Sequence, residues 1–522
     1  MLLFLLLFPL SLFGEITVGT APLSQIDHPV STQDKEAQYH FNQGLTYLFA
    51  FNHDLALREF ELAAKRDPNL AMAYWGMALA VGQNINTDVT PENEIRGYNY
   101  VQQALKLSSP SEVERRYIQA LAVRYTNNPT ADLTSLRLPY KEEMGKLSAA
   151  YPEDLDAATL YAESILDLNP WKWWTPEGKP QDGTFEAVDV LESVLDRNPL
   201  HIGANHFYVH AMEESPYPER GLLSAERLET LLPESGHLLH MPCHIFLLTG
   251  NYERAIRTNT KAIEADRKYI QKYGMGGEYP THYLPHNMYV LARTYMLMED
   301  YPNAIRAANE LIQFLNPYFA TNSHIAHFAY TPLEIMLYFK QWDSILQFRP
   351  PSQAPIVEAF WHYSRGVALA AQGNTEGALQ ERDLMIASKQ KITPHEEIAN
   401  NPATRVFDFA GILLDGWIAN AQGNGEGYIE ALRRAIPIQD AFFYDEPPAW
   451  STPIRVMLGE ALLSQNKFKE AENPFRETLQ KYRRNGRALL GLYNSLKGQN
   501  REWDAFWVQR ELVPALRHFN PN

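Results

Sequence analysis

Small and aromatic residues recur between polar ones along residues 37–70, AQYHFNQGLTYLFAFNHDLALREFELAAKRDPNL, with the spacing of two amphipathic helices. In a 34-residue unit, Gly44 and Ala56 take the eighth and twentieth positions, where small side chains let two antiparallel helices approach closely. Phe60 fills the gap to the next pair, and Pro68 ends the second helix because it lacks a backbone N–H. The pattern therefore predicts a helix pair in this segment.

The same spacing returns along most of the chain. No alternation with a period of two competes with it over any long window, so we predict an all-α protein of roughly ten helix pairs, some degenerate. The repeat resembles the tetratricopeptide repeat, which implies pairs stacked into a curved α-solenoid with a concave groove. Its clearest later copies are GNYERAI (250–256), DYPNAI (300–305), GNTEGAL (373–379) and NKFKEAE (466–472).

The N-terminus departs from the repeat. Residues 1–13, MLLFLLLFPLSLF, are apolar but span only about 20 Å as a helix, which is too short for a hydrocarbon core of about 30 Å. This favours a secretory signal peptide and an exported, periplasmic or secreted protein without a transmembrane segment in the mature chain. The predicted organisation is a signal peptide (1–21), a linker (22–36), a single solenoid (37–515) and a tail (516–522).

Composition excludes several classes of function. The chain of 522 residues has a formal net charge of −16, which disfavours nucleic acid and anionic lipid as partners. Its one cysteine, Cys243, excludes an internal disulfide and a zinc site built from several thiolates. Familiar catalytic motifs such as HExxH, a P-loop and GxSxG are absent from the sequence. Acidic pairs such as Glu213–Glu214 and Asp445–Glu446 are typical of solvated helix faces.

Three aromatic segments interrupt the repeat, at 169–183 (NPWKWWTPEGKPQDG), 268–284 and 440–452 (DAFFYDEPPAWST). Insertions into repeat arrays usually become loops on one face, often the binding face. The alternative is that these aromatic side chains only cover exposed core. On the first interpretation, the residues predicted to form a groove wall or a lid are Trp171, Trp173, Trp174 and Tyr208.

Histidine is concentrated in two segments, HIGANHFYVH (201–210) and GHLLHMPCHIF (236–246). His206 and His210 lie four residues apart and therefore share one helix face. A second pair, His240 and His244, follows 34 residues later, so the two pairs occupy the fifth and ninth positions of the first helix in consecutive units. In tetratricopeptide folds these positions line the groove together with the second position, which is where His237 and His286 fall.

Imidazoles in this arrangement suit a metal ion, and copper or zinc is expected. Aligning LYAES with FYVHA places Glu163 at the position of His210, so it is predicted with His237 and His286 as a further ligand or partner. A peptide or small aromatic ligand in the groove, or no specific role, are the alternatives. Cys243 and Met241 are predicted core residues. Five histidines are predicted surface or loop residues: His53, His201, His282, His324 and His327.

Several longer segments carry a resemblance to a family of exported bacterial tetratricopeptide proteins. The resemblance runs from about residue 40 to 500 and implies the solenoid, but no particular reaction. Two functions remain open: a module that binds a protein or peptide partner or a small ligand in its groove, and a copper- or zinc-dependent oxidase, hydroxylase or hydrolase. The segments are FNHDLALREF, AMAYWGMALAVGQNIN, LNPWKWWTPEGKP, GANHFYVHAMEESPYPER, GHLLHMPCHIFLLTGNY, YLPHN and YDEPPAW.

Overall fold

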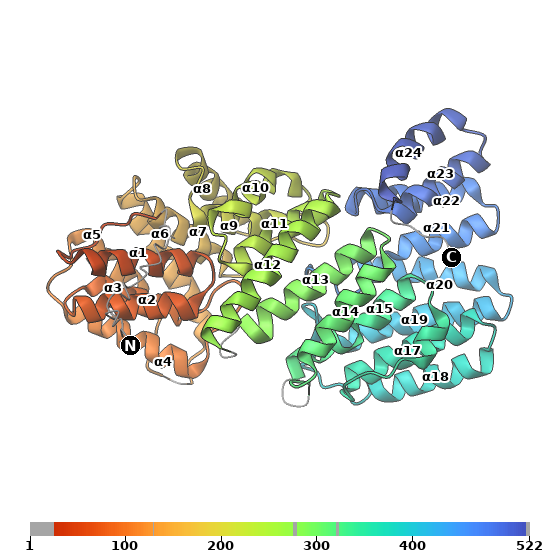
Figure 1. The fold of residues 1–522 in the computed structure, drawn as a ribbon, viewed down its shortest axis with the longest axis horizontal. Helices are drawn as coiled ribbons and strands as arrows, with labels where there is room; N and C mark the ends of the chain where they lie inside the picture. The colour runs from red at the N-terminus through yellow and green to blue at the C-terminus, as the bar shows by residue number, and fades with distance from the viewer. Residues whose placement is uncertain (1–25, 129, 275–278, 320–322, 518–522) are drawn as a thin grey trace, which may run out of the picture.

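The structure is a computed structural model that describes residues 26–128, 130–274, 279–319 and 323–517, and the predicted signal peptide lies outside them. α-Helices dominate the described residues, and consecutive helices pack against each other along the chain (Figure 1). The prediction of an all-α solenoid of the tetratricopeptide type is confirmed. Within the described residues, no helix is long and apolar enough to cross a membrane.

The first half contains α1 (Lys35–Phe49), α2 (His53–Arg66), α3 (Ala71–Ala80), α4 (Pro91–Lys106), α5 (Glu112–Ala122), α6 (Arg137–Ala150), α7 (Leu155–Leu166), α8 (Thr184–Arg197), α9 (Ile202–Glu213), α10 (Leu222–Leu231), α11 (Gly236–Leu248) and α12 (Tyr252–Tyr273). The second half contains α13 (Leu284–Leu297), α14 (Tyr301–Leu315), α15 (Thr331–Tyr338), α16 (Trp342–Gln347), α17 (Pro355–Ala371), α18 (Thr375–Lys389), α19 (Ala403–Ala421), α20 (Gly425–Asp440), α21 (Ile454–Ser464), α22 (Phe468–Lys481), α23 (Gly486–Gly498) and α24 (Glu502–Ala515). Shorter elements are the 3₁₀ helices η1 (Leu133–Leu136), η2 (Pro218–Gly221) and η4 (Ser323–Tyr330), the π-helix η3 (Tyr279–Tyr283), and a small hairpin of β1 (Glu397–Ile398) and β2 (Asn401–Pro402).

The first repeat explains why the helices pair. Asp34 and Asn52 cap the N-termini of α1 and α2 with their side chains. The ring of Phe60 on α2 packs against both Gly44 and Gly76, where a Cβ atom would lie 2.6 Å and 2.4 Å from its nearest ring carbon. The small residues of the repeat therefore mark the places where neighbouring helices touch, as the pattern predicts.

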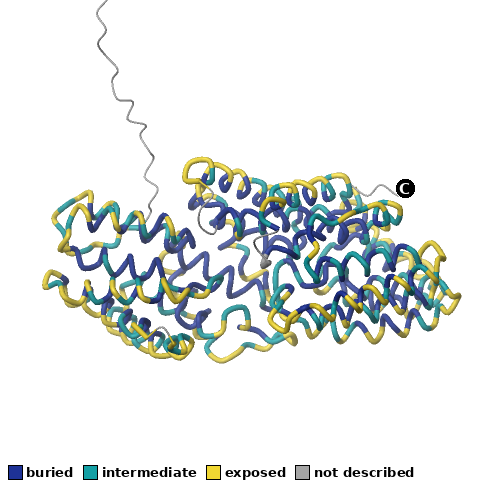
Figure 2. The backbone as a smooth tube through the Cα atoms, turned by 90° about the horizontal axis from the view of Figure 1, so that it is seen from below, coloured by how far each residue is buried: buried dark blue, intermediate teal, exposed yellow. Residues whose placement is uncertain are grey.

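Buried segments run through the inside of the molecule, and exposed ones lie along its outer rims (Figure 2). The buried apolar residues form two large clusters, one from Ala37 to Met298 and the other from Ile263 to Ala505. The two clusters overlap along the chain in α12 and α13. The middle of the chain thus belongs to both halves of the core.

Both halves of the solenoid fold back onto this middle. The end of α1 packs on α9, where a Cβ atom at Gly203 would lie 2.6 Å from the ring of Phe49. From the other half, the carbonyl oxygen of Arg483 accepts a hydrogen bond of 2.8 Å from the Tyr252 hydroxyl. The first repeat therefore covers α9, the second half contacts α12, and nearly all residues of α9 and α11 are buried, so their inner face is not an open groove.

The described part of the predicted linker packs along the first repeats. In this segment, Nδ1 of His28 lies 2.7 Å from a carboxylate oxygen of Asp156 at the start of α7. The backbone N–H of Ser31 donates to Glu114 over 2.7 Å. Residues 26–34 are thus held by polar contacts to α5 and α7.

Candidate metal centre

Three alternate helices, α9, α11 and α13, carry six histidines. His206 and His210 lie on α9, His237, His240 and His244 lie on α11, and His286 lies on α13. The first five are at most 4% exposed, and His286 is half-buried. The structure therefore brings together all six histidines that the sequence suggests as ligands.

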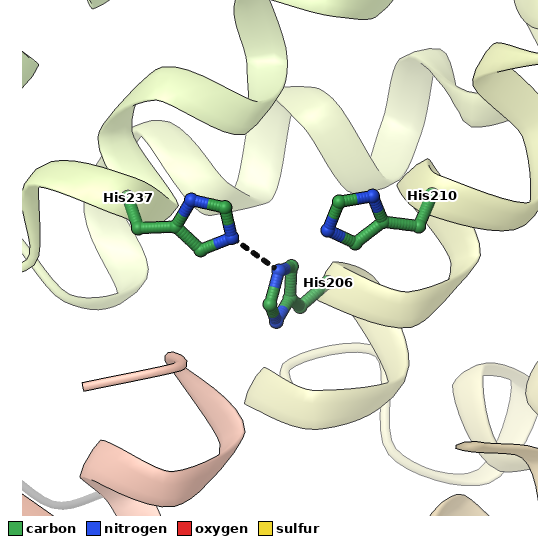
Figure 3. Close-up of side chains that lie close together, drawn as sticks. All are labelled: His206, His210 and His237. Atoms are coloured by element: carbon green, nitrogen blue, oxygen red, sulfur yellow. Dashed lines mark hydrogen bonds between the residues drawn. The ribbon is translucent and has the colours of Figure 1, made fainter. Parts of the chain in front are cut away.

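The six side chains sort into two groups of three. In the first triad, His206, His210 and His237 each offer a ring nitrogen, and these three atoms lie within 4.8 Å of one another. Nε2 of His206 and Nε2 of His237 are 3.0 Å apart, and the three rings converge on a common point (Figure 3). The group combines two residues of α9 with the first histidine of α11.

The second triad repeats this arrangement one unit further along. His240, His244 and His286 also offer three nitrogens within 4.8 Å of one another. Nε2 of His240 and Nε2 of His286 are again 3.0 Å apart. Each triad thus takes the fifth and ninth positions of one first helix and the second position of the next. The sequence indicates these positions, but it suggests a single patch instead of two triads.

The outer nitrogens of three histidines are hydrogen-bonded to oxygen acceptors. His206 Nδ1 lies 2.7 Å from the carbonyl oxygen of Phe49, and His240 Nδ1 lies 2.7 Å from Oδ1 of Asn259. Asn259 donates its amide N–H to a backbone carbonyl, so its oxygen is left to accept from His240. Such bonds fix the ring with Nε2 unprotonated and facing inward, as in the outer shell of metal-binding histidines.

Glu213 joins the two triads from outside. Its Oε1 lies 2.8 Å from Nδ1 of His210, and its Oε2 lies 3.1 Å from Nδ1 of His244. The hydroxyl of Tyr444 donates to Oε2 over 3.4 Å. Glu213 is 1% exposed, so the interpretation of this acidic pair as a solvated face is wrong. Its spacing of three residues from His210 on one helix is the signal that could have identified it.

Burial keeps the imidazoles neutral. Desolvation lowers the pKa of His210 to about 3 and that of His240 to about 4, in the latter case against the hydrogen bond that His240 donates to Asn259. The pKa values of His206, His237, His244 and His286 also lie well below 6.5. Burial is the largest cause, and neighbouring histidines lower these pKa values further, with His210 acting on His206. Neutral imidazole is the form that binds a metal ion. Nε2 of His210 is buried and has no hydrogen-bond partner.

Aromatic rings close the first triad. Phe51, in the turn after α1, stacks on His237 with ring centroids 5.5 Å apart and lies 4.5 Å from the ring of His206. Trp171 meets the ring of His210 edge-on at 5.4 Å, and Tyr283 lies 4.8 Å from the ring of His237. The triad is therefore shielded from water by the first repeat and by two of the aromatic insertions.

The other residues predicted for the groove or lid lie elsewhere around α9. Trp173 and Trp174 are buried, and their indole N–H groups donate to the carbonyls of Leu166 and Ala211 over 2.8 Å. Tyr208 turns away from the histidines and donates its hydroxyl to Glu192. Of this predicted set, the structure brings Trp171 against a histidine of the triads.

Glu163 is buried in α7, but it belongs to a different polar cluster. Burial and the neighbouring Asp167 raise its pKa to about 8, although Arg124 acts in the opposite direction. Arg124 also lies 3.6 Å from Asp167, which suggests one shared network of charges. The structure does not group Glu163 with either histidine triad.

The remaining predictions have mixed outcomes. Cys243 and Met241 are fully buried core residues, as expected. His201 is not a surface residue, because it caps α9 through Nδ1 and is 6% exposed. His282 is exposed, whereas His53 and His327 are half-buried against neighbouring rings. The side chain of His324 lies outside the described residues.

No protein-family model matches the chain, and no curated protein matches its sequence. Solved structures that it resembles over most of its length have low identity and low TM-scores. They are the APC/C hetero-tetramer Cut9–Hcn1 (14% identity, 92% of this chain and 76% of that chain, TM-score 0.32), yeast Tom70 (12%, 92% and 97%, 0.30) and the human IFIT1 dimer with m7Gppp-AAAA (12%, 93% and 91%, 0.35). Scores of this size carry no argument about function.

Proposed function

We propose that the protein binds two copper ions, one in each histidine triad, and that this dinuclear centre oxidises an organic substrate with dioxygen. The observation that carries the proposal is the repeated geometry of the triads. In each, two Nε2 atoms lie 3.0 Å apart at a buried point that a third imidazole also faces. The outer nitrogens of His206, His210 and His240 are hydrogen-bonded to oxygen acceptors, and that of His244 lies 3.1 Å from Oε2 of Glu213.

The close pair of each triad has the separation of two nitrogens bound to one metal ion, and the third nitrogen lies within 4.8 Å of both. A metal–nitrogen bond of about 2.0–2.1 Å and bond angles of roughly 90–110° separate two ligand nitrogens by about 2.9–3.4 Å. Without an ion, one Nε2 of each close pair must donate a proton to the other, and Nε2 of His210 is left unpaired. An ion in each triad would satisfy all three lone pairs at once.

Copper suits these triads better than zinc. Both metals accept imidazole, but copper(II) binds a given set of nitrogen ligands more strongly than zinc does. Hydrolytic zinc sites need a bound water that reaches a substrate, whereas here Phe51 and Trp171 cover the first triad. A covered site of this kind is better suited to electron transfer.

The reaction balances with dioxygen as the oxidant. An organic substrate loses two electrons and two protons, and dioxygen takes them up to give hydrogen peroxide. Copper would supply the redox step by cycling between its +1 and +2 states. The protein's own groups keep the rings in position, since Phe49, Asn259 and Glu213 accept from their outer nitrogens.

Metal content tests this function. The full chain without affinity histidines is loaded with copper and zinc in competition, and bound metal is measured by mass spectrometry. We expect about two copper ions per chain, and about one in His210→Ala or His244→Ala, because each variant breaks one triad. The matched control is His395→Ala, which removes an exposed histidine and should keep both ions.

Two results would reject the proposal. One is a wild-type protein that holds neither metal after loading, and the other is zinc outcompeting copper at both triads. Dioxygen uptake with hydroquinone as the reductant then tests the reaction itself, and uptake should be lost in both triad variants. The second candidate function, a scaffold that binds a partner protein, predicts no bound metal and no gain in the stability of the wild type when copper or zinc is added.

A further inference from the structure

The second half of the solenoid forms a partly open cavity that is separate from the histidine triads. It has a volume of about 230 Å³ and lies on the inner side of α15, α17, α19, α21 and α23. No histidine lines it. Aromatic rings form one wall of the cavity, and polar side chains at the start of α23 form one end of it.

The aromatic wall is built from rings that already pack against each other. Trp417 lies 5.8 Å from Trp342 and 5.3 Å from Tyr428. On another side, Trp450 lies 5.2 Å from Tyr363 and 5.9 Å from Phe360. Rings held by such contacts present flat apolar faces at fixed positions, which suits a planar aromatic ligand.

Asn485 provides the polar end with an unused donor. It is fully buried, and its Oδ1 caps α23 by accepting from the backbone N–H of Ala488 over 2.9 Å. Its Nδ2 is buried without a hydrogen-bond partner. A buried N–H group without a partner is costly, so it indicates an acceptor that occupies the cavity. The N-terminus of α23, a helix of 13 residues, also favours negative charge there.

Arg487 adds a cation beside Asn485. Its Nε lies 3.1 Å from each carboxylate oxygen of Glu299, and its guanidinium group stacks on the ring of Tyr338 at 3.8 Å. Among the described residues, no hydrogen bond uses its two terminal nitrogens. The guanidinium group is thus held in place by its Nε edge and keeps donors for a carboxylate.

Other charged groups of the lining are already paired. Glu334 accepts from the hydroxyls of Tyr289 and Ser451, over 2.9 Å and 2.5 Å. Lys340 lies 3.0 Å from Glu460. Among the charged residues of the lining, Arg487 is the one that keeps donors to spare, which favours an anionic ligand end over a cationic one.

From this arrangement we infer that the cavity binds a small aromatic carboxylate. Its ring lies between Trp417, Trp450 and the tyrosines, and its carboxylate accepts from Nδ2 of Asn485 and from Arg487. The volume is below the ~300–1,000 Å³ of drug-sized pockets, so a ligand of one or two rings fits. The inference does not depend on metal binding by the triads.

Calorimetric titration of the full chain tests this site. 2-Naphthoate is the probe, and 2-naphthylmethylamine is its cationic counterpart. We expect 2-naphthoate to bind at least about tenfold more tightly than the amine. The informative variant is Asn485→Asp, because aspartate keeps the capping oxygen but replaces the donor with negative charge. It should weaken 2-naphthoate binding by at least about tenfold.

The matched control is Asn424→Asp, which changes the capping asparagine of α20 outside the cavity and should bind 2-naphthoate like the wild type. A peptide that ends in tryptophan with a free carboxylate distinguishes a chain end from a free small molecule as the natural source of the acid. Three results would overturn the inference: no binding of 2-naphthoate at millimolar concentration, tighter binding of the amine, or unchanged binding by Asn485→Asp.

Discussion

Nδ1 of His206 lies 2.7 Å from the backbone carbonyl oxygen of Phe49, a residue 157 positions earlier in the chain. Helix α1 thereby ends directly beside the first triad. Gly203 makes this contact possible, because any side chain there would collide with the ring of Phe49. The histidines come from the repeat, but their surroundings depend on the superhelical path that returns α1 to α9.

Phe51→Ala should open the first triad. The side chain is 2% exposed and touches the rings of His206, His210 and His237, so its removal leaves a cavity beside all three. We expect the free energy of unfolding to fall by about 3–5 kcal/mol and metal loss to speed up. Urea unfolding and the rate of metal transfer to a chelator measure the two effects. Phe506→Ala, at a position 45% exposed, is the control, and equal transfer rates would contradict the assigned role.

Glu213→Gln should weaken metal binding without altering the shape of the site. Glutamine keeps the size of the side chain but removes the carboxylate that Nδ1 of His210 meets over 2.8 Å and that lies 3.1 Å from Nδ1 of His244. Loss of such an outer contact typically lowers metal affinity by about 10–100-fold. Competition with a chelator of known affinity measures the change. Glu226→Gln, which alters a surface ion pair, should bind as the wild type does. Unchanged affinity in Glu213→Gln would show that the carboxylate has no part in the site.

Gly236→Ala should disturb the start of α11. A Cβ atom there would lie 1.7 Å from Oδ1 of Asp266, a fully buried residue that accepts from Asn287. Overpacking of this kind costs about 1–3 kcal/mol, and it displaces His237 in the next position. Urea unfolding and metal content should both fall. Gly411→Ala, where the nearest atom is the end of Met385 at 3.6 Å, is the control that should stay close to the wild type.

The contact of residues 26–34 with α7 should weaken at alkaline pH. Burial acts to lower the pKa of His28, but the hydrogen bond and charge of Asp156 outweigh it, and the pKa ends above 6.5. A raised pKa of a base stabilises the fold fully below pH 6.5, and the contribution is lost as the pH rises through the folded value. The pKa of Asp156 is lowered despite burial, by His201 and His28, so its contribution disappears only in acid.

Limited proteolysis and hydrogen exchange at Val30 and Ser31, corrected for intrinsic rates, should therefore reveal more opening at pH 9 than at pH 6. His28→Gln should remove most of this dependence, whereas His395→Gln should retain it. Equal protection of the wild type at both pH values would refute the role assigned to the His28–Asp156 pair.

Much of the fold can be predicted from local spacing. Gly44, Phe60 and Pro68 indicate a helix pair because they act within one unit, and the structure bears out their packing. The positions of His206 and His210 on one helix face follow from the same local rule. The division of the histidines into two triads does not follow from this rule, because it depends on the tilt between neighbouring helices.

Other parts of the candidate site involve partners that are distant in sequence. Phe51 and Tyr444 meet the histidine region from repeats and insertions far away in the chain. Their positions follow from the curvature of the whole array, which single-unit periodicity does not encode. The spacing of Glu213 from His210 on one helix indicates a contact between them, but an acidic pair on a helix usually faces water.

The return of both halves to α9 and α11 makes the centre a late product of folding. While the chain emerges from the ribosome, the histidine pairs of α9 and α11 form before the segment around Tyr444 exists to reach Glu213. Until then these imidazoles are exposed to water and accessible to any metal cation that binds nitrogen ligands. When the second half packs over the triads, it would trap whichever ion is already bound there. The order of synthesis thus leaves an interval in which the supply of metal, and not affinity alone, decides which ion the finished protein contains.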